Sequence, residues 1–252
     1  MIIISPSKNL DLKHEELKLQ PSSPVFLSSS KFIIKKIRVL DVDKIKSLMN
    51  ISKSLADLNF QRFKDINKSE NIKKPAAFMF SGGTFGGLSI RSMNDTQLLY
   101  AQKNLRILSG LYGVLRPFDL IEPYRLEMGT NIYDILGKDL YNYWRNSVTK
   151  ELNNDLFSGK TKFLYNLASK EYSSVIDFNK LKCEVINFDF KKKVKNNLNG
   201  IGMMIKKLRG SMANFIISNN IKDFEGLKKF SGHGFRFAEF DNKKNQLIFV
   251  TS

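Results

Sequence analysis

The segment Leu108–Gly129, LSGLYGVLRPFDLIEPYRLEMG, constrains the structure of this chain more than any other stretch. Its first glycines, Gly110 and Gly113, indicate a tight turn or a close approach of the backbone to another group. The pairs Arg116-Pro117 and Glu122-Pro123 follow, and the residue before a proline is steered away from the helical region. We therefore expect turned and extended backbone here, which either an irregular, well-packed connection or a functional site would explain.

Charged side chains in this segment form the first candidate site. If Tyr124–Met128 is extended, Arg125 and Glu127 point to the same face, because alternate residues of an extended chain share a face. The strand-like run at the N-terminus delivers Lys8 near its end. Because strand ends gather at one side of an α/β sheet, we predict that Lys8 joins Arg125 and Glu127 in one polar site. Arg116 is predicted to belong to the same site.

The same segment closely resembles the signature block of the YaaA family, known as the peroxide stress proteins. Further motifs match the family in the same order along the chain. They are SPSKNL at Ser5–Leu10, GKDLYNYW at Gly137–Trp144, NLASKEY at Asn166–Tyr172 and KKLRGSM at Lys206–Met212. The resemblance implies a central sheet wrapped by helices and loops in an unusual topology. It also implies DNA binding and a role in limiting oxidative damage linked to free iron.

Composition bounds the class of protein. The 252 residues include 41 basic and 24 acidic side chains, giving a formal net charge of +17. Such a balance favours a nucleic-acid partner, although the lysine excess also fits the codon usage of an A/T-rich genome. The single Cys183 excludes an internal disulfide and suits a reducing compartment. No signal peptide or membrane-length apolar run is apparent, so we expect a cytoplasmic protein without a membrane partner or an obligate protein partner.

Hydrophobic periodicity predicts one mixed α/β domain over residues 1–252, with a central mixed β-sheet. Helices are expected at Ser28–Leu40, Asp43–Met49, Ser52–Ile66, Asn94–Asn104, Lys138–Leu156, Ser169–Ile176 and Ser211–Asn219. Strands are expected at Met1–Ile4, Pro75–Phe80, Lys162–Ala168, Cys183–Phe190 and Ile201–Lys206, with a closing hairpin of Phe235–Phe240 and Gln246–Thr251.

The glycine-rich stretch Gly82–Gly87, GGTFGG, is expected to be a loop. It lacks the lysine and hydroxyl residue of a Walker loop and the GxGxxG spacing, so nucleotide binding there is only weakly indicated. Gly83, Thr84 and Phe85 stand where the YaaA family usually has an acidic G-D-V-Y pattern. A role of that family aspartate is therefore in doubt for this chain.

Metal ligands are scarce. His14, His233 and Cys183 are the only imidazole and thiol groups, and none forms a ligand-spaced pair. We therefore predict no zinc or haem, no cofactor, and no triad of the Ser-His-Asp or Cys-His type. Iron held by carboxylates alone stays open but has no motif behind it.

Leu105–Gly113 approximates a helix–hairpin–helix motif, L-x-x-L-x-G-L-x-G, with one residue more than usual between its glycines. Such hairpins direct backbone amides at duplex phosphates. The resemblance to the YaaA family implies this role here, while a glycine turn inside the core is the alternative. The DNA-binding candidates are Leu108, Gly110, Leu111, Gly113, Lys207 and Arg209.

The other motif residues favour a pocket. Most lie at strand ends or loop corners, where α/β scaffolds carry functional groups. The candidates for binding an anionic ligand are Ser5, Lys8, Arg116, Tyr124, Arg125, Lys138, Asn166, Ser169 and Tyr172. Glu127 and Glu171 are the candidates for a catalytic base.

Two functions follow. The leading one is a cytoplasmic protein of the peroxide stress response that binds double-stranded DNA and helps limit iron-linked oxidative damage. The alternative is an enzyme acting on a small anionic or nucleotide-like substrate. An enclosed cleft around Arg116, Arg125 and Glu127 would favour the enzyme. A flat basic face beside an exposed hairpin at residues 110–113 would favour DNA binding.

Overall fold

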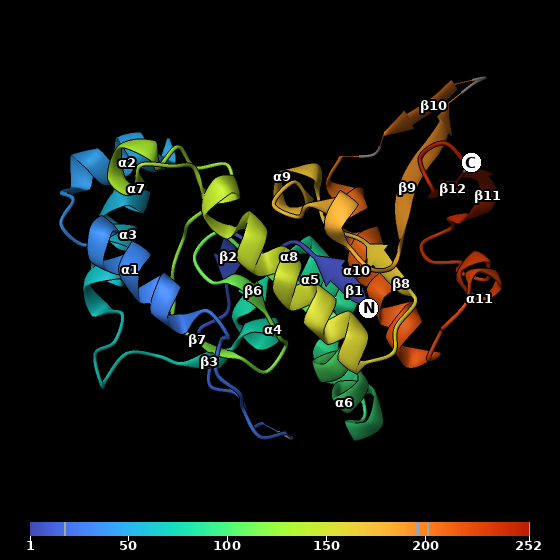
Figure 1. Ribbon diagram of the computed structural model, residues 1–252, viewed down its shortest axis with the longest axis horizontal. Helices are drawn as coiled ribbons and strands as arrows, with labels where there is room; N and C mark the ends of the chain where they lie inside the picture. Colours follow the sequence, from blue (N-terminus) through green and yellow to red (C-terminus); the bar gives the residue numbers. More distant parts are fainter. Residues whose placement is uncertain (18, 195–196, 201, 252) are drawn as a thin grey trace.

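The central feature of the computed structural model, which describes residues 1–17, 19–194, 197–200 and 202–251, is a mixed sheet (Figure 1). Its strands run in the order β11-β12-β9-β8-β1-β5-β6, and β10 pairs with β9. The bounds are β1 Ile2–Ile4, β5 Leu105–Ser109, β6 Gly113–Leu115, β8 Phe163–Asn166, β9 Glu184–Val194, β10 Asn197–Gly200, β11 Arg236–Asp241 and β12 Gln246–Thr251. The mixed α/β fold predicted from the sequence is confirmed.

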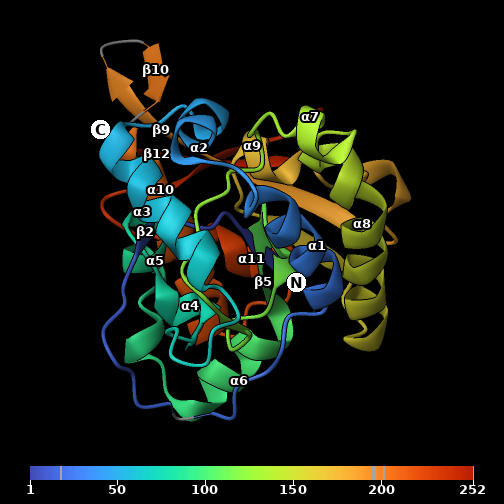
Figure 2. The same cartoon turned by 90° about the vertical axis from the view of Figure 1, so that its left-hand side faces the viewer.

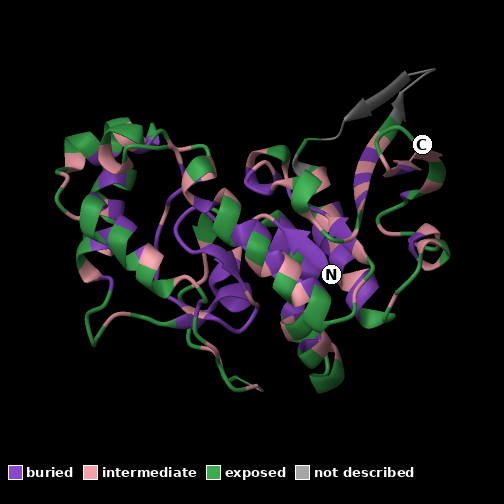
Figure 3. Ribbon diagram, in the orientation of Figure 1, coloured by how far each residue is buried: buried purple, intermediate pink, exposed green. Residues whose placement is uncertain are grey.

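The five strands β5, β1, β8, β9 and β12 run parallel to one another, whereas β6, β10 and β11 pair antiparallel with β5, β9 and β12. Strand β1 lies inside the sheet between β8 and β5, and its three isoleucines are at most 1% exposed. β-Branched residues buried on both faces are typical of a parallel central strand. Figure 3 shows the buried residues concentrated in these central strands.

Helices cover both faces of the sheet. Figures 1 and 2 show α8 (Leu140–Ser158) on one face, and α5 (Gly83–Leu88) with α10 (Met203–Ser218) on the other. The helix α6 (Asp95–Asn104) begins at a capping box between Asn94 and Gln97. Shorter elements are α9 Lys170–Ser173, α11 Phe224–Lys228 and the 3-10 turns η1 Ile90–Ser92 and η2 Phe178–Lys180.

A group of helices lies at one end of the molecule, on the left in Figure 1. It comprises α1 Leu27–Ile37, α2 Val42–Met49, α3 Lys53–Asp65 and α7 Tyr133–Leu136. Asp41 and Ser52 cap α2 and α3 by accepting backbone hydrogen bonds from Lys44 and Leu55. The helices α1, α2 and α3 were predicted from their apolar periodicity to within a few residues, whereas α7 was not predicted. Within the described residues, none of the helices is both long and apolar enough to cross a bilayer.

Three element predictions were wrong. The run 75–80 is not one strand but β3 (Lys74–Pro75), α4 (Ala76–Met79) and β4 (Phe80–Ser81). Strand β3 pairs with β7 (Leu120–Ile121), and β4 pairs with β2 (Asn9–Leu10). Residues 76–79 are all buried, and a short apolar run without periodicity does not distinguish a buried helical turn from a strand.

The predicted glycine loop is the helix α5, and the predicted strand at 201–206 is mostly the start of α10. Residue 201 itself lies outside the described residues. The glycines allow the two helices to touch backbone to backbone. A Cβ on Gly87 would lie 2.1 Å from the carbonyl oxygen of Lys207, and one on Gly210 would lie 1.9 Å from that of Thr84. Close packing of helices, not loop flexibility, therefore explains GGTFGG.

Candidate functional site

The carboxyl ends of β1 and β8 meet at a pair of serines. Ser5 directly follows β1, and its Oγ accepts a hydrogen bond from the backbone N–H of Ser169 at 2.8 Å. The two hydroxyls are 3.1 Å apart. The next strand of the central sheet after β1 is β5, which lies on one side of the β1–β8 pair. The next strand after β8 is β9, which lies on the other side of that pair. Ligands of α/β proteins bind outside the carboxyl ends of strands at such a reversal of direction.

Lys8, Arg125 and Glu127 lie together, although more than a hundred residues separate Lys8 from the other two. The Glu127 carboxylate accepts from Arg125 Nη2 at 2.9 Å through Oε1, and pairs with Lys8 Nζ at 2.5 Å through Oε2. The side chains are 54%, 16% and 23% exposed for Lys8, Arg125 and Glu127. The structure thus brings together these three residues, and their functional roles stay predictions.

Arg62 of α3 adds a cation that the sequence analysis missed. Burial lowers the pKa of Arg62, and the positive charge of Arg125 lowers it further. Its Nη1 donates to Asn59 Oδ1 at 3.4 Å. Nothing in the local sequence marks Arg62, because only the packing of the helical group against the Tyr124–Met128 segment brings it here. Arg62 therefore lies near Arg125, which itself pairs with Glu127.

A second carboxylate, Glu171, lies nearby. Its Oε1 accepts from the backbone N–H of Gly129 at 3.2 Å. Burial raises the pKa of Tyr172, and the negative charges of Glu171 and Glu127 raise it further. Both carboxylates therefore lie near the Tyr172 hydroxyl, which stays protonated at neutral pH. A phenol of this kind donates a hydrogen bond and does not act as a base.

Tyr124 and Asn166 hold the backbone segments that carry the site residues. Tyr124 is 4% exposed, its hydroxyl lies 2.6 Å from Ser109 Oγ, and burial raises its pKa well above the usual range. Asn166 donates from Nδ2 to Asn187 Oδ1 at 2.9 Å and accepts from the backbone N–H of Ala168 at 3.2 Å. Tyr124 therefore anchors the extended segment, and Asn166 fixes the turn after β8.

Arg116 and Lys138 lie elsewhere. Arg116 pairs with Glu151 of α8 at 3.5 Å and lines a cavity with Arg106, at the opposite edge of the sheet. The prediction that Arg116 shares the site was wrong, because β6 runs antiparallel to β5 and delivers Arg116 to the edge where β5 begins. Lys138 is exposed, with its Nζ 5.8 Å from the ring centre of Tyr143.

The helix–hairpin–helix geometry is also wrong. Residues 105–115 form the strands β5 and β6 joined by a tight turn, and Leu108 and Leu111 are fully buried. A Cβ on Gly110 would lie 2.4 Å from the Leu126 carbonyl oxygen, and the Gly110 carbonyl accepts from Trp144 Nε1 at 2.9 Å. Gly113 has a φ of +69° and faces the same indole. The alternative, a glycine turn inside the core, accounts for this segment.

The remaining DNA-binding candidates, Lys207 and Arg209, are on α10. Lys207 is exposed, as is Lys206, whereas burial lowers the pKa of the partly buried Arg209. A Cβ on Gly83 would lie 3.0 Å from Lys206 Cβ, and one on Gly82 would lie 3.0 Å from Ser7 Oγ. The start of α10 therefore lies close to the Ser7-Lys8 segment. We call Lys8, Arg62, Arg125, Lys206 and Lys207 the basic strip.

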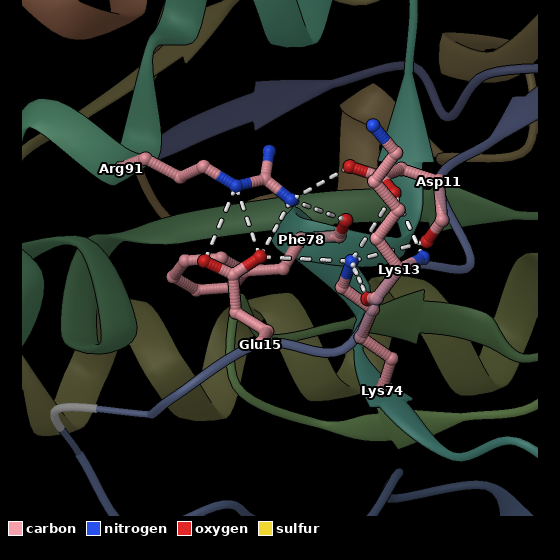
Figure 4. Close-up of polar contacts among 6 residues, drawn as sticks. All are labelled: Asp11, Lys13, Glu15, Lys74, Phe78 and Arg91. Carbon is pink, nitrogen blue, oxygen red and sulfur yellow. Dashed lines mark hydrogen bonds and ion pairs between the residues drawn. The ribbon is translucent and has the colours of Figure 1, made fainter.

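A polar clamp, shown in Figure 4, holds the segment that follows Lys8. The side chain of Lys74 is only 4% exposed, and its Nζ donates to the carbonyl oxygens of Asp11 and Lys13 at 3.1 and 2.8 Å. Arg91 Nη2 pairs with Asp11 at 2.9 Å and with Glu15 at 2.7 Å. Because it pins residues 11–15, the clamp limits how far the Lys8 segment can move.

Metal ligands do not cluster in the described part of the chain, where no group of three or more His, Cys, Asp and Glu side chains is arranged to hold an ion. The expectations of no metal and no cofactor stay predictions.

Comparison with known proteins gives one family. The family model described as "Peroxide stress protein YaaA" matches residues 1–240 of this chain. A UPF0246 protein from Idiomarina loihiensis is 40% identical over 251 residues, covering 99% of this chain and 97% of the relative. One from Legionella pneumophila is 38% identical over 253 residues, covering 99% and 98%. One from Rickettsia rickettsii is 39% identical over 252 residues, covering 100% of both.

Proposed function

Because this chain belongs to the family of peroxide stress proteins YaaA, we propose that it acts in the response to hydrogen peroxide by binding double-stranded DNA through the phosphate backbone. The observation that carries the proposal is the basic strip. Its five cations come from four separate segments, and Glu127 is the one carboxylate paired within it among the described residues. The net charge of +17 adds a long-range attraction to a polyanion.

The spread of the strip supports an extended ligand. Lys206 and Lys207 project from α10, Lys8 follows β1, and Arg62 and Arg125 reach the site from the helical group and the proline-rich segment. A single small anion would contact only a part of this set, whereas a duplex presents many phosphate charges along its length. Backbone contacts of this kind carry little sequence information, so we expect little sequence preference.

Protection against iron-linked damage is part of the proposal. Free duplex DNA holds a condensed layer of cations, and ferrous ions in that layer generate hydroxyl radicals beside the bases when they meet hydrogen peroxide. Lysines and arginines that neutralise phosphates release those cations. The effect on iron is then indirect and needs no iron site in the protein. We propose a cytoplasmic location, which the single Cys183 suits.

Salt dependence tests the proposal. With five phosphates neutralised, the log–log slope of the association constant against salt concentration is expected to be about −4.5, at about −0.9 per phosphate. Lys8→Glu is expected to weaken duplex binding and to make the slope shallower. Lys46→Glu on α2 changes the net charge equally at an exposed lysine that is not part of the strip, and serves as the control. A slope near zero, or equal losses in both variants, would reject the proposal.

One observation favours the enzyme as a second candidate. The Nε of Arg125 is buried and has no hydrogen-bond partner among the described residues, while the Nη2 of the same side chain donates to Glu127. Buried donors are nearly always satisfied, so an acceptor from a bound anion would complete this arginine. If Glu127→Gln abolishes turnover of a small phosphorylated compound while duplex binding is kept, the enzyme becomes the better account.

A further inference from the structure

A cavity of about 890 Å³ lies at the end of the central sheet where the parallel strands β1, β5 and β8 begin, opposite the basic strip. We call this end the amino edge, and the end where these strands finish the carboxyl edge. The cavity is lined where β5 and β8 begin and where α6, α8 and α10 end. Binding pockets for small ligands and cofactors usually measure about 300 to 1,000 Å³. The cavity is therefore large enough for a molecule the size of a nucleotide, and the DNA-binding proposal makes no use of it.

Positive charge dominates the lining. Six basic side chains face one acidic side chain, Asp155. The six are Lys103, Arg106, Arg116, Lys160, Lys162 and Lys222. Arg106 is only 4% exposed, and its Nε and Nη1 are held by Asp155 Oδ2 at 2.6 Å and by the Gln102 carbonyl at 3.1 Å. Within the described residues, its Nη2 has no hydrogen-bond partner, so a buried guanidinium on the wall has a donor to offer.

Helix ends explain only part of this charge. The carboxyl ends of α6, α8 and α10 each carry roughly half a negative charge, and lysines commonly complement them. Three such ends offset about 1.5 positive charges. The six basic groups outnumber the two carboxylates, Asp155 and the Arg116 partner Glu151, by more than this. The remaining excess points to an anionic ligand with more than one negative charge.

Aromatic rings line the same cavity. Phe163 and Tyr165 of β8 stack with ring centres 6.2 Å apart and an interplanar angle of 10°. Tyr100 of α6 is half-buried beside them, and burial raises its pKa. Burial also raises the pKa of Tyr165 to about 12, so its hydroxyl is a hydrogen-bond donor at neutral pH. Tyr100 and Phe163 are partly exposed and offer ring surface on which a planar base can stack, whereas Tyr165 is only 4% exposed and packs against Phe163.

We propose that this cavity binds a nucleoside polyphosphate, with the phosphates among the lysines and Arg106 and the base against the aromatic rings. One backbone feature fits this role. Lys160 has a φ of +49°, a conformation that glycine or asparagine adopts far more readily than lysine. A lysine kept at a strained helix end, directly on the cavity wall, is explained by its charge. The site is separate from the basic strip, so either proposal can fail alone.

Calorimetric titration of the purified full-length protein with ATP tests the proposal, with tripolyphosphate and adenosine as the parts of the probe. The double variant Lys160→Glu/Lys222→Glu is expected to weaken ATP binding at least tenfold. The control Lys46→Glu/Lys53→Glu, at exposed positions on α2 and α3, changes the net charge equally and is expected to leave ATP binding unchanged. Undetectable ATP binding, or an equal loss in the control, would overturn the proposal.

Two further variants separate the parts of the ligand. Tyr100→Leu is expected to weaken ATP several-fold without changing tripolyphosphate. Tripolyphosphate bound as tightly as ATP, with no effect of Tyr100→Leu, would reject the nucleoside. Lys160→Gly removes the charge and relieves the backbone strain, so it is expected to weaken ATP binding while the protein unfolds at the same or a higher temperature. Binding unchanged in Lys160→Gly would reject Lys160 as a phosphate contact and, with it, the reason given for its strained backbone.

Discussion

The two edges of the central sheet both gather positive charge, but they are built in different ways. At the carboxyl edge, cations from four segments form the basic strip, and its lysines are largely exposed. At the amino edge, the basic groups surround a cavity, and the central one, Arg106, is almost fully buried. An exposed strip suits a long polyanion, whereas a walled cavity suits a small one. The same net charge of +17 therefore supports two different kinds of ligand in one molecule.

The largest expected effect is a loss of stability at the amino edge, compared here with an exposed ion pair outside both sites. Arg106→Ala removes the ion-pair partner of Asp155 and leaves that carboxylate largely buried and unpaired. We therefore expect a loss of about 3–5 kcal/mol in the free energy of unfolding. Lys180→Ala removes an exposed partner of Asp177 and should cost less than about 1 kcal/mol. Urea denaturation measures both. A small loss for Arg106→Ala would mean that the amino edge is not tied together by this pair.

The next largest loss of stability is expected in the polar clamp of Lys74 and Arg91 that holds residues 11–15. Lys74→Met removes a buried ammonium from two carbonyls and two nearby carboxylates, and we expect a loss of about 3 kcal/mol. Arg91→Ala, at a side chain that is 47% exposed, should cost about 1 kcal/mol. Denaturant unfolding of the two variants checks this order. The reverse order would show that Arg91, and not Lys74, holds residues 11–15.

Within the basic strip, Arg125 separates function from stability. Arg125→Ala leaves Glu127 paired with Lys8, so we expect a stability loss of only about 1 kcal/mol. Duplex affinity should fall about tenfold, which corresponds to about 1.4 kcal/mol. Parallel binding and unfolding measurements check both values. A loss of several kcal/mol in stability that accounts for the lost binding would make Arg125 a structural tie.

The smallest expected effect concerns pH at the amino edge. Burial disfavours the phenolate and raises the pKa of Tyr165 to about 12 in the folded protein, from an ordinary value of 10.0. Its contribution to stability is therefore complete below about pH 10 and is lost as the pH rises towards 12. Tyr165→Phe should flatten that part of the stability profile. An unchanged decline between pH 10 and 12 would assign it to other tyrosines.

The sequence predicted the features that depend on local patterns. Apolar periodicity predicted the helices over Asp43–Met49, Ser52–Ile66 and Asn94–Asn104, and alternation along the extended segment puts Arg125 and Glu127 on one face. The convergence with Lys8 followed from a general rule about strand ends. Each of these inferences needed only neighbouring residues or the order of elements.

What failed depends on contacts between distant segments. The stretch GGTFGG reads as a loop until α10, more than a hundred residues later, packs against its glycines. Arg116 was predicted at the carboxyl edge because the antiparallel direction of β6, which places it at the amino edge, cannot be read from the sequence. Arg62 reaches the site only through the packing of the helical group. Tertiary packing decides all three, and no local pattern reports it.

The division of labour between the two edges is tested most directly by a crossed binding measurement. Lys206→Glu/Lys207→Glu at the basic strip and Lys160→Glu/Lys222→Glu at the cavity carry the same change in net charge. Each is titrated with duplex DNA and with ATP at one salt concentration. We predict that the first variant loses at least tenfold in DNA affinity and keeps ATP binding, and that the second keeps most of its DNA affinity and loses ATP binding. Equal losses of both ligands in both variants would mean that only net charge matters, and would contradict the account.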